Sequence, residues 1–317
     1  MTGLYIHIPF CRKKCFYCSF MTVTNQNHHA DEYARCLAQE MRMYEGAQIQ
    51  SVYFGGGTPS FLSEACFLFL ANAVKKNFSM ARDAEFTVEM NPEDVTDQKL
   101  CCYRDAGVTR LSLGVQTFDE ARLKRLGRGH SVFQAKEASH MMRRHGFRHV
   151  NIDLMYGFPG QTRDDIKKDL AVLKETACDH VSIYGLTVEE GSRFFVDRVT
   201  ASQGDEAARQ YVFICEELRR LGFDQYEVSN FARPGRRSIH NMNYWKGGNY
   251  IGMGTAAHSH QDGLRYWNVS RLRLYIEKIQ KEGSARADKE RLTSQQRLGE
   301  ALVFGLRMLD GVSLAQI

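Results

Sequence analysis

The stretch Tyr5-Ile-His-Ile-Pro-Phe-Cys-Arg-Lys-Lys-Cys-Phe-Tyr-Cys18 brings three cysteines together in a C-x3-C-x2-C spacing. On a loop that curls back, the thiolates of Cys11, Cys15 and Cys18 can all face one soft metal centre. A structural zinc ion would need a fourth ligand, and none follows in the next several residues. An iron–sulfur cluster held by three thiolates instead of four keeps one iron open to an outside ligand. Three incidental buried cysteines are the alternative, but the regular spacing favours the cluster.

Outward from this stretch, short apolar runs alternate with amphipathic helical patterns. Helices are predicted over residues 30–44, 63–76 and 206–221, and another begins at Thr162, which has the capping partner Asp165 three residues on. Such alternation predicts parallel βαβ units and an α/β fold built as an open or complete β/α barrel. The six predicted strands cover residues 4–8, 51–54, 85–90, 110–115, 150–155 and 180–184.

Residues that can bind a ligand stand where the predicted strands end. The cysteine loop follows the first strand and Gly55-Gly-Gly57 the second, and the later strands end at Glu89, Gln116, Asp153 and Tyr184. Each residue alone fits an ordinary strand end or turn, but β/α barrels carry their chemistry at this edge. The glycine run lacks the Lys-Ser/Thr of a phosphate-binding loop. It can expose backbone groups to a ligand such as an amino acid, or simply turn the chain.

The chain changes character from about residue 188 onward. An alternating, strand-like run over residues 223–231 precedes His240-Asn-Met-Asn-Tyr-Trp245 and a glycine-dense stretch. A flat apolar ligand such as haem could lie on Tyr244 and Trp245 with a histidine as axial donor. Packing of the aromatic rings beneath the barrel mouth is the interpretation that the residues alone favour. Residues 270–317 are predicted to be mostly helical, and the final residues 310–317 resemble the start of another element.

Composition narrows the possible functions. The 317 residues are 43% hydrophobic and 25% charged, with a net charge of +5, which is typical of a globular protein. No run of five like charges exists, so a nucleic-acid partner is not expected. The sequence shows no secretory signal and no stretch of eighteen apolar residues. The cysteines number nine, which is odd, and the six outside the C-x3-C-x2-C stretch are scattered. This pattern favours a reducing cytoplasm over a disulfide framework.

The cysteine spacing, with Phe16-Tyr17 before the last cysteine, resembles the signature of the radical S-adenosylmethionine (SAM) superfamily. Further motifs resemble its oxygen-independent coproporphyrinogen dehydrogenase branch: residues 5–11, 54–60, 114–119 and 153–162. The resemblance implies a partial (β/α)6 barrel and a [4Fe–4S] cluster on Cys11, Cys15 and Cys18. It also implies that Arg128 meets the SAM carboxylate. The implied SAM contacts are Tyr5, Gly56, Gly57, Thr58, Glu89, Gln116, Arg128 and Asp153.

Two features separate the chain from the dehydrogenase itself. Phe20 stands where that enzyme has a fourth cysteine, and His240-Asn-Met-Asn-Tyr-Trp245 matches the H-N-x-x-Y-W pattern of HemW-type haem chaperones. The resemblance thus reverses the preference for simple packing at this segment and implies haem binding by His240, Asn241, Tyr244 and Trp245. It implies a radical SAM core over residues 1–188 and a C-terminal α+β extension over residues 189–317, without the family's final small domain.

The leading hypothesis is a cytoplasmic haem chaperone that binds a cluster, SAM and haem and delivers haem to acceptor proteins, some of them membrane-associated. An electron donor such as flavodoxin or ferredoxin would be a further partner. A catalytic radical SAM enzyme of porphyrin metabolism is the second hypothesis, and Phe20 argues against coproporphyrinogen oxidation in particular. A barrel with a structural zinc ion is the third.

Overall fold

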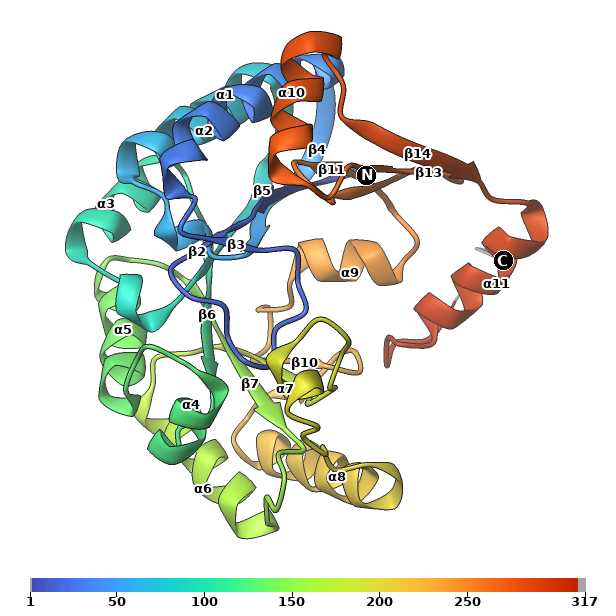
Figure 1. Cartoon of the computed structure of the whole chain (residues 1–317). Helices are drawn as coiled ribbons and strands as arrows, with labels where there is room; N and C mark the ends of the chain where they lie inside the picture. Colours follow the sequence, from blue (N-terminus) through green and yellow to red (C-terminus); the bar gives the residue numbers. More distant parts are fainter. Residues whose placement is uncertain (1, 313–317) are drawn as a thin grey trace.

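A twelve-stranded sheet with six parallel strands at its centre organises the protein (Figure 1). The computed structural model describes residues 2–312. All neighbours among the central strands are parallel, so the predicted α/β fold and all six predicted strands are confirmed. In sheet order, the central strands are β1 (Thr2–Ile8), β4 (Ala47–Gly56), β5 (Phe78–Met90), β6 (Arg110–Gln116), β7 (His149–Tyr156) and β8 (His180–Gly185).

Helices cover the outer face of this curved sheet, as Figure 1 shows. Most of them link one parallel strand to the next, which places them on one side because such crossovers share a hand. The predicted capping box of Thr162 and Asp165 is present at the start of one of them. The helices are α1 (Ala30–Met41), α2 (Glu64–Asn77), α3 (Asp97–Asp105), α4 (Glu120–Leu126), α5 (Val132–Arg144), α6 (Arg163–Val172) and α8 (Gly204–Arg220).

The C-terminal part extends the sheet at both edges. One of its strands, β11, runs parallel beside β1, whereas β10 runs antiparallel beside β8. The division at residue 188 stays a prediction, since both parts share one sheet. The elements are α7 (Arg193–Val196), β9 (Asp224–Gln225), β10 (Asn230–Ala232), α9 (Ile239–Trp245), β11 (Asn249–Met253), β12 (His258–Gln261), β13 (Leu264–Asn268), α10 (Leu272–Glu282), β14 (Arg286–Arg291) and α11 (Ser294–Gly305).

One prediction about the C-terminal part needs correction, and one strand there was not predicted. The run over residues 223–231 forms the two short strands β9 and β10 with a reversal between them, because they pair antiparallel with each other. The segment from residue 270 contains the strand β14 between two helices; all six of its residues are exposed and most are charged, so no apolar alternation revealed it. Of the expected element over residues 310–317, positions 313–317 lie outside the described residues.

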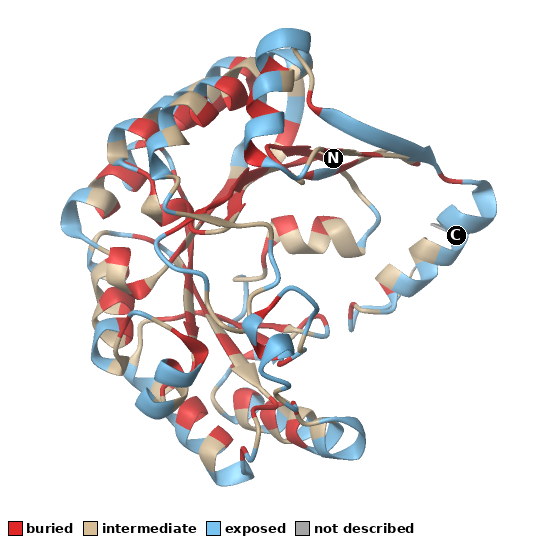
Figure 2. Ribbon diagram, in the orientation of Figure 1, coloured by how far each residue is buried: buried red, intermediate tan, exposed pale blue. Residues whose placement is uncertain are grey.

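Burial follows the layers of the fold (Figure 2). Apolar side chains of the central strands and of the inner faces of α1, α2 and α5 form one continuous core. The two short strands β2 (Phe10–Cys11) and β3 (Val23–Thr24) pair with each other and close the base of the cysteine loop. Within residues 2–312, no helix has the length and apolar character needed to cross a membrane.

Candidate functional site

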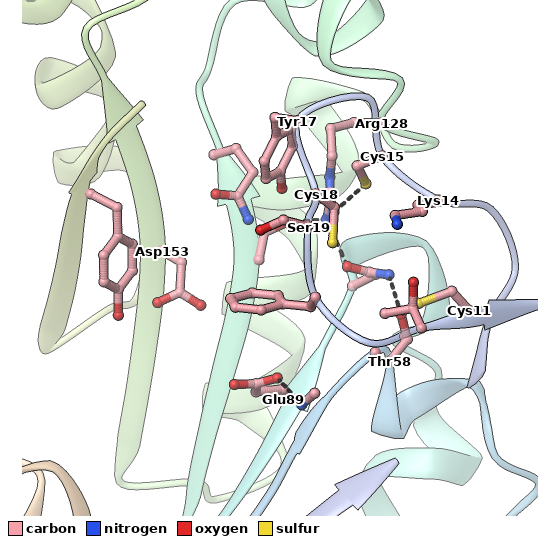
Figure 3. A pocket seen from close by; sticks show the side chains of 18 of the residues that line it. Cys11, Lys14, Cys15, Tyr17, Cys18, Ser19, Thr58, Glu89, Arg128 and Asp153 are labelled. Atoms are coloured by element: carbon pink, nitrogen blue, oxygen red, sulfur yellow. Dashed lines mark hydrogen bonds between the residues drawn. The ribbon is translucent and has the colours of Figure 1, made fainter. Parts of the chain in front are cut away.

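A cavity of about 440 Å³ lies at the carboxyl ends of the parallel strands. Figure 3 shows the cysteine loop on one side of it and the strand that carries Asp153 on the other. All predicted cluster and SAM residues except Tyr5 line this cavity, so the structure brings together positions up to 142 residues apart: Cys11, Cys15, Cys18, Gly56, Gly57, Thr58, Glu89, Gln116, Arg128 and Asp153.

Backbone hydrogen bonds hold the loop that carries the three cysteines. The amide of Phe16 donates to Leu126 O (3.0 Å), and the amide of Cys18 donates to Cys15 O (3.2 Å). Cys11 is buried beside Thr58, with 3.3 Å between Sγ and Oγ1. Burial raises the pKa of Cys11 to about 11. Burial raises the pKa of Cys18 as well. Binding of a metal centre by Cys11 and Cys18 therefore releases protons.

The donor set fits a cluster better than a single ion. All three cysteines are free and face the same cavity. Among the described residues, no three His, Cys, Asp or Glu side chains converge as ligands of one metal ion. A cluster attaches its cysteine ligands to different irons, so its thiolates stand further apart than those around one ion.

Gly56 and Gly57, at the end of β4, let the chain lie close to β1 and to Pro9, which follows it. Gly56 has a φ of +109°, and a Cβ there would come within 2.4 Å of the His7 ring. A Cβ on Gly57 would lie 2.7 Å from the Pro9 carbonyl oxygen, just before the cysteine loop. The glycine run is thus required by backbone packing as well as by its place on the cavity wall.

Two half-buried carboxyl groups lie across the cavity from the cysteines. Glu89 accepts hydrogen bonds from Tyr53 Oη (2.7 Å) and the Gly56 amide (3.1 Å). Asp153 accepts from Ser112 Oγ (2.9 Å) and Asn151 Nδ2 (2.8 Å). Burial raises the pKa of Glu89 to about 7 and raises that of Asp153 as well. A cationic ligand would favour the ionised form of both groups.

Arg128 links the cysteine loop to the strand ends. It follows Gly127, whose φ of +73° ends α4. Its Nη1 donates to Cys15 Sγ (3.4 Å), and its Nη2 donates to Asn91 Oδ1 (2.7 Å) and to the Gly114 carbonyl. Its Nε is buried without a hydrogen-bond partner among residues 2–312. This guanidinium is therefore placed to bind a ligand carboxylate.

Gln116, the last residue of β6, has a backbone in the left-handed region with a φ of +76°. The register between β6 and β7 shifts at this residue. That backbone conformation is uncommon outside glycine and is found at functional positions. Tyr53, Asn91 and Ser112 also line the cavity. No role was predicted for them, although Asn91 directly follows the third predicted strand.

Tyr5 and the residues of the 240–245 motif lie elsewhere. The Tyr5 ring stacks on Tyr53 with centroids 6.2 Å apart, and Tyr5 lines a neighbouring cavity together with Tyr244. Trp245, at the other end of α9, packs beneath Arg307, whose guanidinium lies 4.2 Å from the ring centroid. Asn241 is half-buried in the first turn of α9.

His240 is only 2% exposed, and both its ring nitrogens are hydrogen-bonded. Nδ1 lies 2.8 Å from Ser51 Oγ, and Nε2 lies 3.1 Å from Tyr244 Oη. Burial lowers the pKa of His240 to about 4, so the ring is neutral. Coordination of the haem iron by His240 would require at least one of these bonds to break.

Comparison with known proteins shows the family of the chain. The sequence model of the radical SAM superfamily matches residues 5–173. "Heme chaperone HemW" of Lactococcus lactis is 35% identical over 97% of this chain and 82% of that protein. The Escherichia coli protein of the same name is 38% identical over 81% and 69%.

Among solved structures, "Coproporphyrinogen III oxidase (HemN) from Escherichia coli is a Radical SAM enzyme" superposes with a TM-score of 0.85 at 26% identity, covering 97% of this chain and 75% of that one. The superfamily implies a [4Fe–4S] cluster and SAM, to which the thiols and polar groups of the cavity are suited. The chain belongs to the radical SAM superfamily and, within it, to the HemW family.

Proposed function

We propose that Cys11, Cys15 and Cys18 hold a [4Fe–4S] cluster and that SAM binds beside it in the cavity. The observation that carries this is the convergence of three free cysteines, two half-buried carboxyl groups and a half-buried guanidinium on one cavity at the strand ends. When bound, the cluster supplies electrons and an open iron site for the amino acid part of SAM. Arg128 would bind the carboxylate, and Glu89 and Asp153 would offset the positive charge of the ligand.

The rest of the cavity wall orients the ligand. Thr58, beside Cys11, and the backbone of Gly56 and Gly57 face the space between the cysteine loop and Glu89. Gln116, held in its left-handed conformation, presents its amide from β6. These groups would fix the position of SAM relative to the cluster, and the surrounding protein would exclude water.

We further propose that the protein is a haem chaperone that passes haem to acceptor proteins, some of them membrane-associated. The support is its similarity, at 35–38% identity over most of the chain, to bacterial proteins named heme chaperone HemW. In this proposal residues 1–188 bind the cluster and SAM, and residues 189–317 contribute the segment with His240, Asn241, Tyr244 and Trp245.

The exposed residues Arg12, Lys13 and Lys14 on the cysteine loop would attract an anionic electron donor such as flavodoxin or ferredoxin. Nine free cysteines support a cytoplasmic setting.

Haem titration of the anaerobically reconstituted protein tests the chaperone proposal. We expect saturable binding of one haem with a changed Soret band, followed by transfer to an apo-acceptor. An unchanged haem spectrum at all protein concentrations would refute it.

A catalytic radical SAM enzyme is the second candidate, because the fold superposes on that of coproporphyrinogen III oxidase with a TM-score of 0.85. Phe20, at the position of that enzyme's fourth cysteine, is 68% exposed at the cavity and argues against the same reaction. Substrate-dependent release of 5′-deoxyadenosine with a modified porphyrin product would favour catalysis over delivery.

A further inference from the structure

A second cavity, of about 410 Å³, adjoins the cluster and SAM cavity. The two share Phe20, Gly56 and Glu89 in their walls. Most of the second cavity's other lining is aromatic or apolar and includes Tyr5, Met21, Tyr244, Tyr250, Ala256 and Ala257. Its size lies within the range of sites for small organic ligands, and its flat rings suit a planar apolar one.

His258 is the histidine in this wall that can coordinate a metal without losing a bond. The other one, His7, uses Nδ1 with Tyr5 Oη (3.0 Å) and Nε2 with the Met21 carbonyl (2.8 Å). His258 is exposed, and neither of its ring nitrogens is hydrogen-bonded to any residue among 2–312. Its ring stacks on Trp267 with centroids 5.6 Å apart and an angle of 23°, which fixes its orientation while leaving the nitrogens free.

A third hollow continues from the second and supplies positive charge. It shares Met21 with the second cavity and is lined by Arg271 and Arg273. Both arginines are exposed, and neither forms an ion pair with a carboxylate of the described residues. The amide of Ala256 donates to Val269 O (2.9 Å), and Thr255 Oγ1 donates to Ser270 O (2.8 Å). These bonds hold the arginine-bearing turn beside the loop that leads to His258.

We propose that haem binds in the second cavity with its iron on His258 and its propionates toward Arg271 and Arg273. This rests on the proposed chaperone function and assigns its site. An apolar planar wall, a free imidazole and two unpaired guanidinium groups match the three chemical parts of haem: ring, iron and carboxylates. His240 then acts as a positioning residue, because its bonds to Ser51 and Tyr244 hold Tyr244 at the cavity wall.

Titration of the full chain with ferric haem, followed by absorption and electron paramagnetic resonance, tests the assignment. The variants are His258→Ala, His258→Met and His240→Ala, each checked for folding by circular dichroism. We expect His258→Ala to lose the histidine-ligated spectrum and added imidazole to restore it. His258→Met should give a different ligand signature. His240→Ala should keep the histidine-ligated spectrum but bind haem more weakly, because Tyr244 loses its hydrogen bond to the His240 ring.

The arginines are tested with Arg271→Gln/Arg273→Gln and with haem dimethyl ester, which lacks the carboxylates. The double variant should bind haem at least about tenfold more weakly, the loss expected for charge-assisted hydrogen bonds, and bind the ester as the wild type does. Failure of the wild type to bind haem would refute the chaperone proposal. Wild-type binding with an unchanged His258→Ala spectrum would overturn this site alone.

Discussion

Glu85→Gln should destabilise the protein strongly, because Glu85 is the buried anchor of α9. Its carboxylate accepts from Arg110 Nε (2.8 Å), Ser238 Oγ (3.0 Å), and the amides of Ile239 (3.2 Å) and His240 (3.0 Å). Burial alone would raise the pKa of Glu85, but Arg110 and these N–H groups outweigh it and lower the pKa below its usual value. The group is therefore ionised at pH 7, and the substitution removes a buried charge.

The expected cost follows from the burial of the pair. The side chains of Arg110 and Glu85 are 3% and 5% exposed, and removing one partner of a buried pair costs about 3–5 kcal/mol. Urea unfolding followed by circular dichroism gives the change in free energy of unfolding. The control is Glu282→Gln, which breaks the exposed pair of Lys278 and Glu282 and should cost about 0.5 kcal/mol or less. A loss below about 1 kcal/mol for Glu85→Gln would refute this reasoning.

Three further predictions concern the cluster and SAM cavity. Gly57→Ala places a Cβ 2.7 Å from the Pro9 carbonyl oxygen, so it should lower the iron and sulfide content after reconstitution. The control is Gly299→Ala in α11, where an added Cβ meets no atom within 4 Å, and it should leave that content unchanged. Burial raises the pKa of Glu89 to about 7, so its carboxylate forms as the pH rises from 6 to 8. The affinity for SAM, measured by calorimetry, should therefore increase over this pH range. Glu89→Gln should remove this pH dependence of SAM affinity. Arg128→Met should weaken SAM binding by at least about tenfold, as expected for loss of a charge-assisted hydrogen bond. Equal SAM affinities of the variant and the wild type would contradict the role of Arg128 in binding the SAM carboxylate.

The parallel strands, and the edge of the sheet at which the candidate site lies, could be predicted from the sequence because both depend on local patterns. Strands such as β4 and β7 are short apolar runs bounded by glycine or polar residues, and parallel strands place their carboxyl ends together. Glu89 and Asp153 could therefore be predicted as neighbours although 64 residues separate them. The cysteine spacing likewise lies within one loop.

Pairings over long distances could not be predicted in this way. Nothing near Glu85 indicates that it receives the helix start at Ser238 to His240, because that contact spans more than 150 residues. For the same reason the sequence suggests one ligand surface over residues 240–245, whereas the short helix α9 turns His240 inward and Trp245 toward α11. The charged edge strand β14 has no apolar period to reveal it.

The most direct test of the central claim is haem titration of the anaerobically reconstituted chain, with iron, sulfide and SAM binding measured on the same preparation. The account predicts about four irons and one SAM per chain, together with one haem whose spectrum depends on the chain. A preparation that holds the cluster and SAM but leaves the haem spectrum unchanged would contradict it.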